Sequence, residues 1–176
     1  MRLRSLFIMA LAMVSPVALW AQSSPVAGDP VVLFLQHNRS ADHAVVETPS
    51  GLQYKVLTPG SEAARPTADD VALVMYKGSL TNGTVFDQSE QPTPMAISEV
   101  VPGFSEALTL MSRGAKFRVW IKPTLGYGDQ ATGPIPANSV LVFDIEMIDW
   151  KTRAELMQMQ QQAQPPVTPA AALPTK

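Results

Sequence analysis

One stretch of the chain decides the fold, and it reads Val100-Val101-Pro102-Gly103-Phe104-Ser105-Glu106-Ala107-Leu108-Thr109-Leu110-Met111. Pro102 and Gly103 suit the start of a helix, and Gly114 supplies a stop after its end. Apolar residues recur between them at i, i+3, i+4 and i+7 and form one stripe, which consists of Phe104, Ala107, Leu108 and Met111. A helix of about two turns is marginal alone in water. We therefore predict a sheet that packs over the stripe.

The segments around this helix alternate between apolar and polar residues with period two, which is typical of strands. Strands are predicted at 52–57, 71–80, 85–87, 115–121 and 140–148, with a short extended segment at 95–98. Asn82-Gly83 predicts a tight hairpin turn between the second and third strands. In the strand at 115–121, Trp120 alternates with the apolar residues and is expected on the polar face with Lys116 and Arg118.

The pattern predicts an α+β fold, in which a sheet of the predicted strands wraps around one short α-helix. We place this domain at 48–150, after an N-terminal arm at 22–47. Within the arm, Val31–Asn38 reads either as one or two turns of helix or as a short hydrophobic arm, and the residues do not separate the two. A short helix is expected after the domain, in 151–176, followed by a disordered tail rich in Gln and Pro.

The first 21 residues have the pattern of a secretory signal peptide. A basic start, Met1-Arg2-Leu3-Arg4, precedes an apolar run that ends at Trp20, and the small residue Ala21 follows. We expect cleavage after Ala21 and a periplasmic or secreted protein of a Gram-negative bacterium. The alternative is an uncleaved membrane anchor, although the run contains Pro16 and is short for a span.

Composition excludes several kinds of chemistry. The chain has no cysteine, which rules out disulfides, thiolate metal sites and thiol nucleophiles. Its two histidines, His37 and His43, stand in the polar arm without the partners that a metal or catalytic site needs. No phosphate-binding glycine loop or nucleophile elbow is present, and no cofactor or metal is expected. Cleavage of the leader would remove Arg2 and Arg4 and change the net charge from −2 to −4, and this mild acidity argues against nucleic acid as a partner.

One acidic residue stands in an aromatic setting. Asp87 follows Phe86 directly after the predicted hairpin, and Tyr76 lies on the strand before it. Taken singly, such an aspartate is interpreted as a solvated turn residue, and Tyr76 and Phe143 are interpreted as core residues. The interpretation changes when five motifs are taken in order, which are Val74–Gly78, Asn82–Ser89, Val100–Leu108, Pro123–Gly128 and Leu141–Glu146.

With these motifs, the region from Gly51 to Asp149 resembles the FKBP-type peptidyl-prolyl cis-trans isomerases. Its entry segment, Pro49–Val56, is most similar to the bacterial branch typified by the macrophage infectivity potentiator. The resemblance implies an α+β fold with a curved antiparallel β-sheet of about five strands around one short α-helix, and the proline pocket between them. The implied activity is that of an isomerase, or rotamase, that acts on X-Pro bonds of unfolded or exported polypeptides and assists their folding. The resemblance also implies binding of macrolide inhibitors such as FK506 or rapamycin.

The resemblance assigns the residues of the proline pocket by motif match. The catalytic positions are Tyr76, Phe86, Asp87, Tyr127 and Phe143. The substrate-binding positions are Met95, Val100, Val101, Phe104 and Ile135. The resemblance further implies that the Val101 N–H and the Tyr127 hydroxyl donate hydrogen bonds to substrate carbonyls.

Two positions depart from the family pattern. Phe104 stands where a tryptophan is usual on the pocket floor, and Met95 replaces an aromatic residue on the wall. Phenylalanine keeps the floor apolar, and methionine is softer and more adaptable. We expect activity to survive with weaker or altered affinity for rigid macrolides. Pro134 and Ala137 also depart from the commonest loop, which leaves substrate contacts there open.

Two further questions stay open at this point. The alternative function is a holdase-type chaperone, or a peptide-binding module, that grips proline-containing segments with little turnover. The arm at 22–47 is too short for the long helical dimerisation region of this bacterial branch, so we expect a monomer.

Overall fold

The structure is a computed structural model that describes residues 28–61 and 63–163. The leader predicted at 1–21 and the end of the Gln- and Pro-rich tail lie outside the described residues. The helices are α1 (Pro30–Ala41), η1 (Ile97–Glu99), α2 (Pro102–Leu110), η2 (Pro123–Leu125) and α3 (Arg153–Ala163), where η marks a 3-10 helix. The strands are β1 (Val46–Glu47), β2 (Gln53–Thr58), β3 (Val71–Leu80), β4 (Val85–Gln88), β5 (Thr93–Ala96), β6 (Lys116–Ile121) and β7 (Leu141–Lys151).

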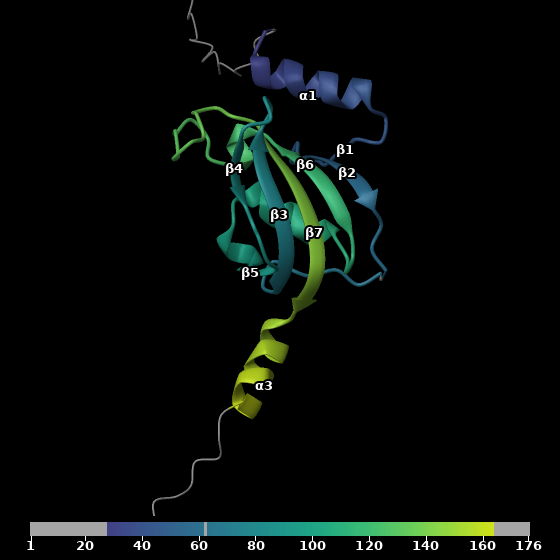
Figure 1. Ribbon diagram of the computed structural model, residues 1–176. Helices are drawn as coiled ribbons and strands as arrows, with labels where there is room; N and C mark the ends of the chain where they lie inside the picture. The colour runs from purple at the N-terminus through teal and green to yellow at the C-terminus, as the bar shows by residue number, and fades with distance from the viewer. Residues whose placement is uncertain (1–27, 62, 164–176) are drawn as a thin grey trace, which may run out of the picture.

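The strands form one antiparallel sheet in the order β1-β2-β6-β7-β3-β4, and β5 also pairs with β3. Its centre is the long pair β3 and β7, which runs from Val71 opposite Lys151 to Leu80 opposite Leu141. Figure 1 shows the sheet curving across α2, with α1 at one end of the sheet and α3 at the other. The expected α+β architecture is confirmed. The sheet has seven strands because the short strands β1 and β5 add to the five expected.

Helix α2 begins with Pro102 in its first turn, as the sequence predicts. The whole predicted stripe is buried, with Phe104 at 3% exposure and Ala107, Leu108 and Met111 at 0%. Gly103 permits the close approach of the helix to β6, because a Cβ there would lie 2.6 Å from Ile121 Cγ2. The helix start is thereby held against the inner face of the sheet.

The turn between β3 and β4 uses its two predicted residues differently. Gly83 has a φ of +87°, which glycine adopts without steric cost. Asn82 contributes through its side chain, because its Oδ1 accepts a hydrogen bond of 3.0 Å from the Thr84 N–H. The hairpin predicted from Asn82-Gly83 is confirmed, and it sets β4 beside β3.

Residues 30–41 form a helix, which decides between the two interpretations of the arm. Asp29 caps α1 by accepting a hydrogen bond of 2.8 Å from the Val31 N–H, and Pro30 occupies the first turn. The helix packs on the outer face of the sheet, where its apolar side chains cover a small second core. The residues of this second core are Val31, Phe34, Leu35, Val45, Trp120, Val140 and Val142.

This packing corrects the expectation for Trp120. Its side chain lies on the face opposite Val119, yet it is only 8% exposed because α1 covers it. Gln53 in β2 is also fully buried and ties the helix down. Its side-chain oxygen accepts a hydrogen bond of 2.9 Å from Asn38 Nδ2, and its side-chain nitrogen donates one of 2.9 Å to the Leu35 carbonyl.

Helix α3 follows β7 directly and starts with a reciprocal capping box. The Thr152 hydroxyl accepts a hydrogen bond of 3.1 Å from the Glu155 N–H, and Glu155 accepts 2.8 Å from the Thr152 N–H. The helix extends to Ala163, further into the Gln-rich segment than the sequence indicates. Across residues 28–61 and 63–163, no helix is both long and apolar enough to cross a membrane.

Candidate functional site

A cavity of about 330 Å³ opens on the inner face of the sheet, at the N-terminal end of α2. Seven parts of the fold contribute to its wall: β3, β4, β5, η1, α2, β7 and the loop after η2. The lining residues are Tyr76, Asp87, Met95, Glu99, Val100, Val101, Phe104, Tyr127 and Phe143. The cavity therefore gathers residues that lie far apart in the sequence.

Three aromatic rings form an apolar corner in this cavity. The Phe104 and Phe143 ring centroids are 4.9 Å apart at an interplanar angle of 79°, and Tyr76 meets Phe104 at 6.0 Å and 82°. Edge-to-face packing of this kind suits the charge distribution of aromatic rings and holds each ring in place. Phe104 and Phe143 are only 3% and 6% exposed, so they make the floor.

A glycine on β3 makes room for these rings. A Cβ on Gly78 would lie 2.6 Å from the Phe86 ring and 2.7 Å from the Phe143 ring. Phe86 packs edge-on against Phe143, with centroids 5.5 Å apart, and so supports the floor from behind.

The polar side of the cavity is a hydrogen-bonded pair. The Tyr76 hydroxyl donates to Asp87 Oδ2 at 2.7 Å. Burial, and then the hydrogen bond to Asp87, raise the pKa of Tyr76 to about 12. The phenol is therefore neutral at physiological pH and keeps its proton directed at the carboxylate.

Ser89, the residue after β4, fixes the backbone of Tyr76. Its hydroxyl accepts a hydrogen bond of 2.8 Å from the Tyr76 N–H and donates one of 3.3 Å to the Tyr76 carbonyl. Ser89 falls within one of the five sequence motifs but is not among the predicted site residues. A serine hydroxyl that bonds to backbone leaves no periodic pattern by which it could be found.

The structure brings eight of the ten predicted site residues together on the cavity wall, and it places Phe86 and Ile135 elsewhere. Phe86 supports Phe143 from behind, and Ile135 is 5% exposed within the main hydrophobic core. Glu99 lines the cavity although the sequence analysis does not single it out. A lone glutamate between a short extended segment and a helix carries no recognisable pattern.

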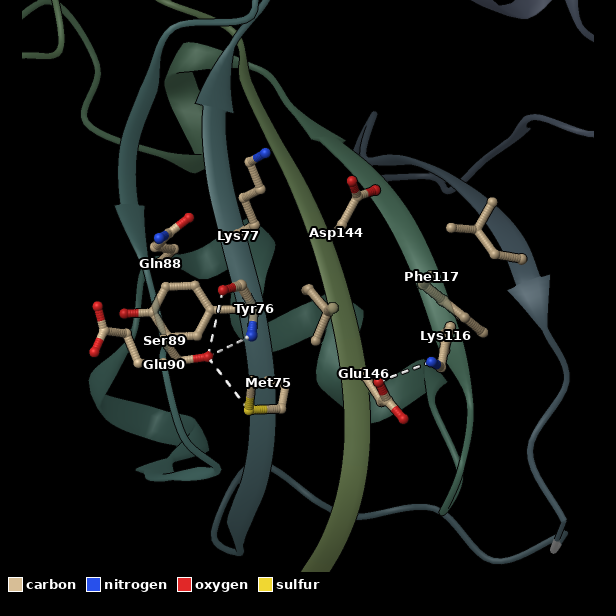
Figure 2. A pocket seen from close by; sticks show the side chains of 12 residues that line it. Met75, Tyr76, Lys77, Gln88, Ser89, Glu90, Lys116, Phe117, Asp144 and Glu146 are labelled. Carbon is tan, nitrogen blue, oxygen red and sulfur yellow. Dashed lines mark hydrogen bonds and ion pairs between the residues drawn. The ribbon is translucent and has the colours of Figure 1, made fainter.

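Figure 2 shows a second hollow of about 350 Å³ on the outer face of the sheet, where Lys77, Lys116, Asp144 and Glu146 project. Lys116 pairs with Glu146 at 2.9 Å across two strands. Tyr76 borders both hollows, but the other predicted site residues do not line this one. The outer hollow is a surface of cross-strand ion pairs. Of the three rings in the aromatic corner, Tyr76 lines this hollow, and Phe104 and Phe143 do not.

Within the described residues, no group of three or more His, Asp or Glu side chains could hold a metal ion. The cavity offers an apolar floor, the Tyr76–Asp87 pair, the Glu99 carboxylate and the Tyr127 hydroxyl. This set can bind an apolar ring and order a nearby carbonyl. It contains no histidine, cysteine or lysine on the cavity wall that could serve as nucleophile.

Comparison with known proteins agrees with this geometry. Residues 62–148 match the family described as FKBP-type peptidyl-prolyl cis-trans isomerase. The chain is 44% identical over 107 residues to the isomerase FkpA of Aeromonas hydrophila, an alignment that covers 59% of this chain and 40% of the relative. It is 40% identical over 138 residues to the outer membrane protein MIP of Legionella longbeachae, covering 76% of this chain and 57% of the relative. The chain thus spans about half the length of these curated relatives.

Solved structures show the same fold. A peptidyl-prolyl cis-trans isomerase from Pseudomonas syringae superposes with a TM-score of 0.66 at 34% identity, covering 69% of this chain and 91% of that one. FkpA from Escherichia coli superposes with a TM-score of 0.65 at 33% identity, covering 69% of this chain and 58% of that one. The chain belongs to the FKBP-type peptidyl-prolyl cis-trans isomerases, in the branch of the macrophage infectivity potentiator.

Proposed function

We propose that this chain catalyses the cis-trans isomerisation of X-Pro peptide bonds in exported polypeptides. The observation that carries the proposal is the apolar corner of Tyr76, Phe104 and Phe143 beside the hydrogen-bonded Asp87. A pyrrolidine ring fits against such a floor. The X-Pro amide then lies at the mouth of the cavity, where Asp87 and Tyr127 lie.

Rotation of the amide requires the loss of its C–N double-bond character, against a barrier of about 18–20 kcal/mol. In the twisted state the carbonyl is less polar, so transfer of the bond from water into an apolar cleft favours that state over the planar one. No covalent intermediate is formed. The aromatic walls hold the ring while the amide turns.

Two donors are available to substrate carbonyls. None of the hydrogen bonds of the described residues uses the Val101 backbone N–H as donor, and Tyr127 is 39% exposed at the cavity edge. Asp87 has a supporting electrostatic part. It orients the Tyr76 hydroxyl, and the reaction moves no proton that a general acid or base would carry.

We also propose the setting in which the enzyme works. The basic start and apolar run at 1–21 support export to the periplasm of a Gram-negative cell, where unfolded proline-containing polypeptides are the clients. The Legionella relative is named an outer membrane protein, and a protein in that location is likewise exported from the cytoplasm. The isomerase domain is assigned to 48–150, the protein acts as a monomer, and macrolides such as FK506 are candidate inhibitors.

The test is a protease-coupled assay on a tetrapeptide with one proline. Asp87→Leu and Phe143→Tyr should each lower kcat/KM about tenfold or more, which corresponds to roughly 1.4 kcal/mol of transition-state stabilisation. Asp144→Leu is the matched control, because it removes a carboxylate from the outer face of β7. Unchanged rates in both site variants would exclude the assignment of the cavity.

The same variants separate catalysis from simple peptide binding. An aggregation-suppression assay measures the holdase alternative directly. Loss of turnover in Asp87→Leu with unchanged suppression of aggregation would assign the two activities to different surfaces. Suppression without any turnover by the unmodified protein would favour the binding module instead.

A further inference from the structure

We propose that a hollow beneath α3 continues the proline cavity and binds substrate residues that flank the proline. This inference rests on the proposed isomerase function, since it extends the same binding site. The hollow has a volume of about 210 Å³ and lies between η1, the start of β3 and α3. Glu99 lines both the hollow and the proline cavity, so the two share one wall.

The wall between the two spaces is the short segment from β5 to η1. Met95 faces the proline cavity, and Ala96 and Ser98 line the hollow. An extended polypeptide advances about 3.3 Å per residue. A chain that leaves the cavity past Glu99 therefore reaches the hollow within a few residues of its proline.

Helix α3 is positioned to form the far side of this hollow. Its start is held by the capping box of Thr152 and Glu155, and Leu156 is half-buried against the sheet end. Figure 1 shows α3 leaving the end of the sheet at which β5 lies. The helix presents Leu156 and Met157 to the hollow, one turn after its first residue.

Met157 is the residue best suited to contact a substrate. It is 53% exposed and lies on the hollow, although burial of a methionine in a core would be favourable. Methionine is unbranched and polarisable, so it adapts to side chains of many shapes. The hollow thus suits an apolar side chain of variable sequence next to the proline.

The hollow fits a flexible segment better than a second folded copy. Its apolar wall of Val71 and Ala96 is bordered by the charged groups of Asp69, Glu99 and Arg153. Such a border can hydrogen-bond the exposed amides of an unfolded chain. A stable interface between folded proteins uses roughly 20–30 residues a side, far more than this small hollow offers.

The experiment compares Met157→Gln with Met159→Gln. Met159 is the matched control, because it is 55% exposed on the same helix and does not line the hollow. Glutamine is a good helix former, so neither change disturbs α3. The probes are a tetrapeptide with one proline and the same peptide lengthened by three residues, including one leucine, at either end.

For the unmodified protein, one of the two longer peptides should have a kcat/KM several-fold to tenfold above that of the tetrapeptide, as burial of much of a leucine side chain predicts. Met157→Gln should abolish this gain and leave turnover of the tetrapeptide unchanged. Met159→Gln should retain the gain. Calorimetric Kd values for the same peptides should follow the same order.

Equal behaviour of the two variants on the longer peptides would overturn the inference and leave the isomerase function standing. A dimer in light scattering that Met157→Gln dissociates would also overturn it, because a second copy would then occupy the hollow. If no peptide is turned over but the affinity difference persists, the isomerase function fails and flanking-residue binding holds.

Discussion

Phe104 belongs to both the core and the site. It is 3% exposed within the main hydrophobic cluster, and its ring meets Phe143 and Tyr76 edge-to-face at the cavity floor. The start of α2 therefore serves stability and binding with one side chain. Substitutions at this position separate the two contributions.

Phe104→Ala should lower the free energy of unfolding by about 3–5 kcal/mol, because it leaves a cavity in the core, and it should also lower kcat/KM. Phe104→Trp keeps an apolar floor and enlarges it, so its main effect should be tighter binding of a macrolide ligand. Urea denaturation, the tetrapeptide assay and ligand titration measure these effects. The same loss of stability in both variants would contradict this account of the floor.

The aromatic residues of the site could be predicted from the sequence because they occur in ordered motifs. Glu99 and Ser89 could not, since their roles depend on neighbours that only the folded sheet supplies. Ile135 illustrates the opposite case. Its motif position predicts a place in the pocket, whereas its buried side chain is not among the residues that line the cavity.

At the level of elements, the period-two pattern predicts β6 correctly but does not reveal what covers its outer face. Trp120 follows the strand pattern and is nevertheless buried, because α1 packs over it. Two residues that suit a helix start, Asp29 and Pro30, precede the segment 31–38. A continuous apolar run follows them and is equally compatible with an extended arm, so the sequence alone leaves both readings open.

Trp120→Ala should lower the free energy of unfolding by about 3–5 kcal/mol and expose the amides of α1 to hydrogen exchange. Turnover of the tetrapeptide should persist, because α1 lies on the face of the sheet opposite the cavity. Leu33→Ala is the control on the same helix, since Leu33 is 53% exposed and should change stability little. Unchanged exchange in α1 after Trp120→Ala would show that the helix is held by other contacts.

For the whole molecule, an ion pair joins the turn after α2 to the end of the central strand β7. Arg113 Nε donates to Asp149 Oδ1 at 2.5 Å, and its guanidinium lies 4.7 Å from the centroid of the Trp150 ring. Lys151 adds a second contact to Asp149 at 3.1 Å. Sequence patterns predict each strand separately, but not this connection across 36 residues of chain.

The hydrogen bond from Arg113 lowers the pKa of Asp149 from 3.8 to about 2. Because the folded-state pKa lies below the unfolded one, this contribution to stability is complete above the unfolded pKa and is lost as the pH falls toward 2. The midpoint of urea unfolding should therefore decrease between pH 5 and pH 2 in the unmodified protein. The urea midpoint of the Asp149→Asn variant should decrease less steeply over this pH range. An identical pH profile in the two proteins would contradict a stabilising role for the pair.

The two tryptophans within the described residues lie at opposite ends of the sheet, each beside a terminal helix. Trp120 is sealed beneath α1, and Trp150 lies near α3 with its indole N–H buried and without a hydrogen-bond partner in the described part of the chain. The emission of Trp120 should therefore respond to changes at α1, and the emission of Trp150 to changes near α3. In the chain without the predicted leader, which contains the third tryptophan, Trp20, a Trp150→Phe variant should report optically on departure of α1 and a Trp120→Phe variant on changes around α3.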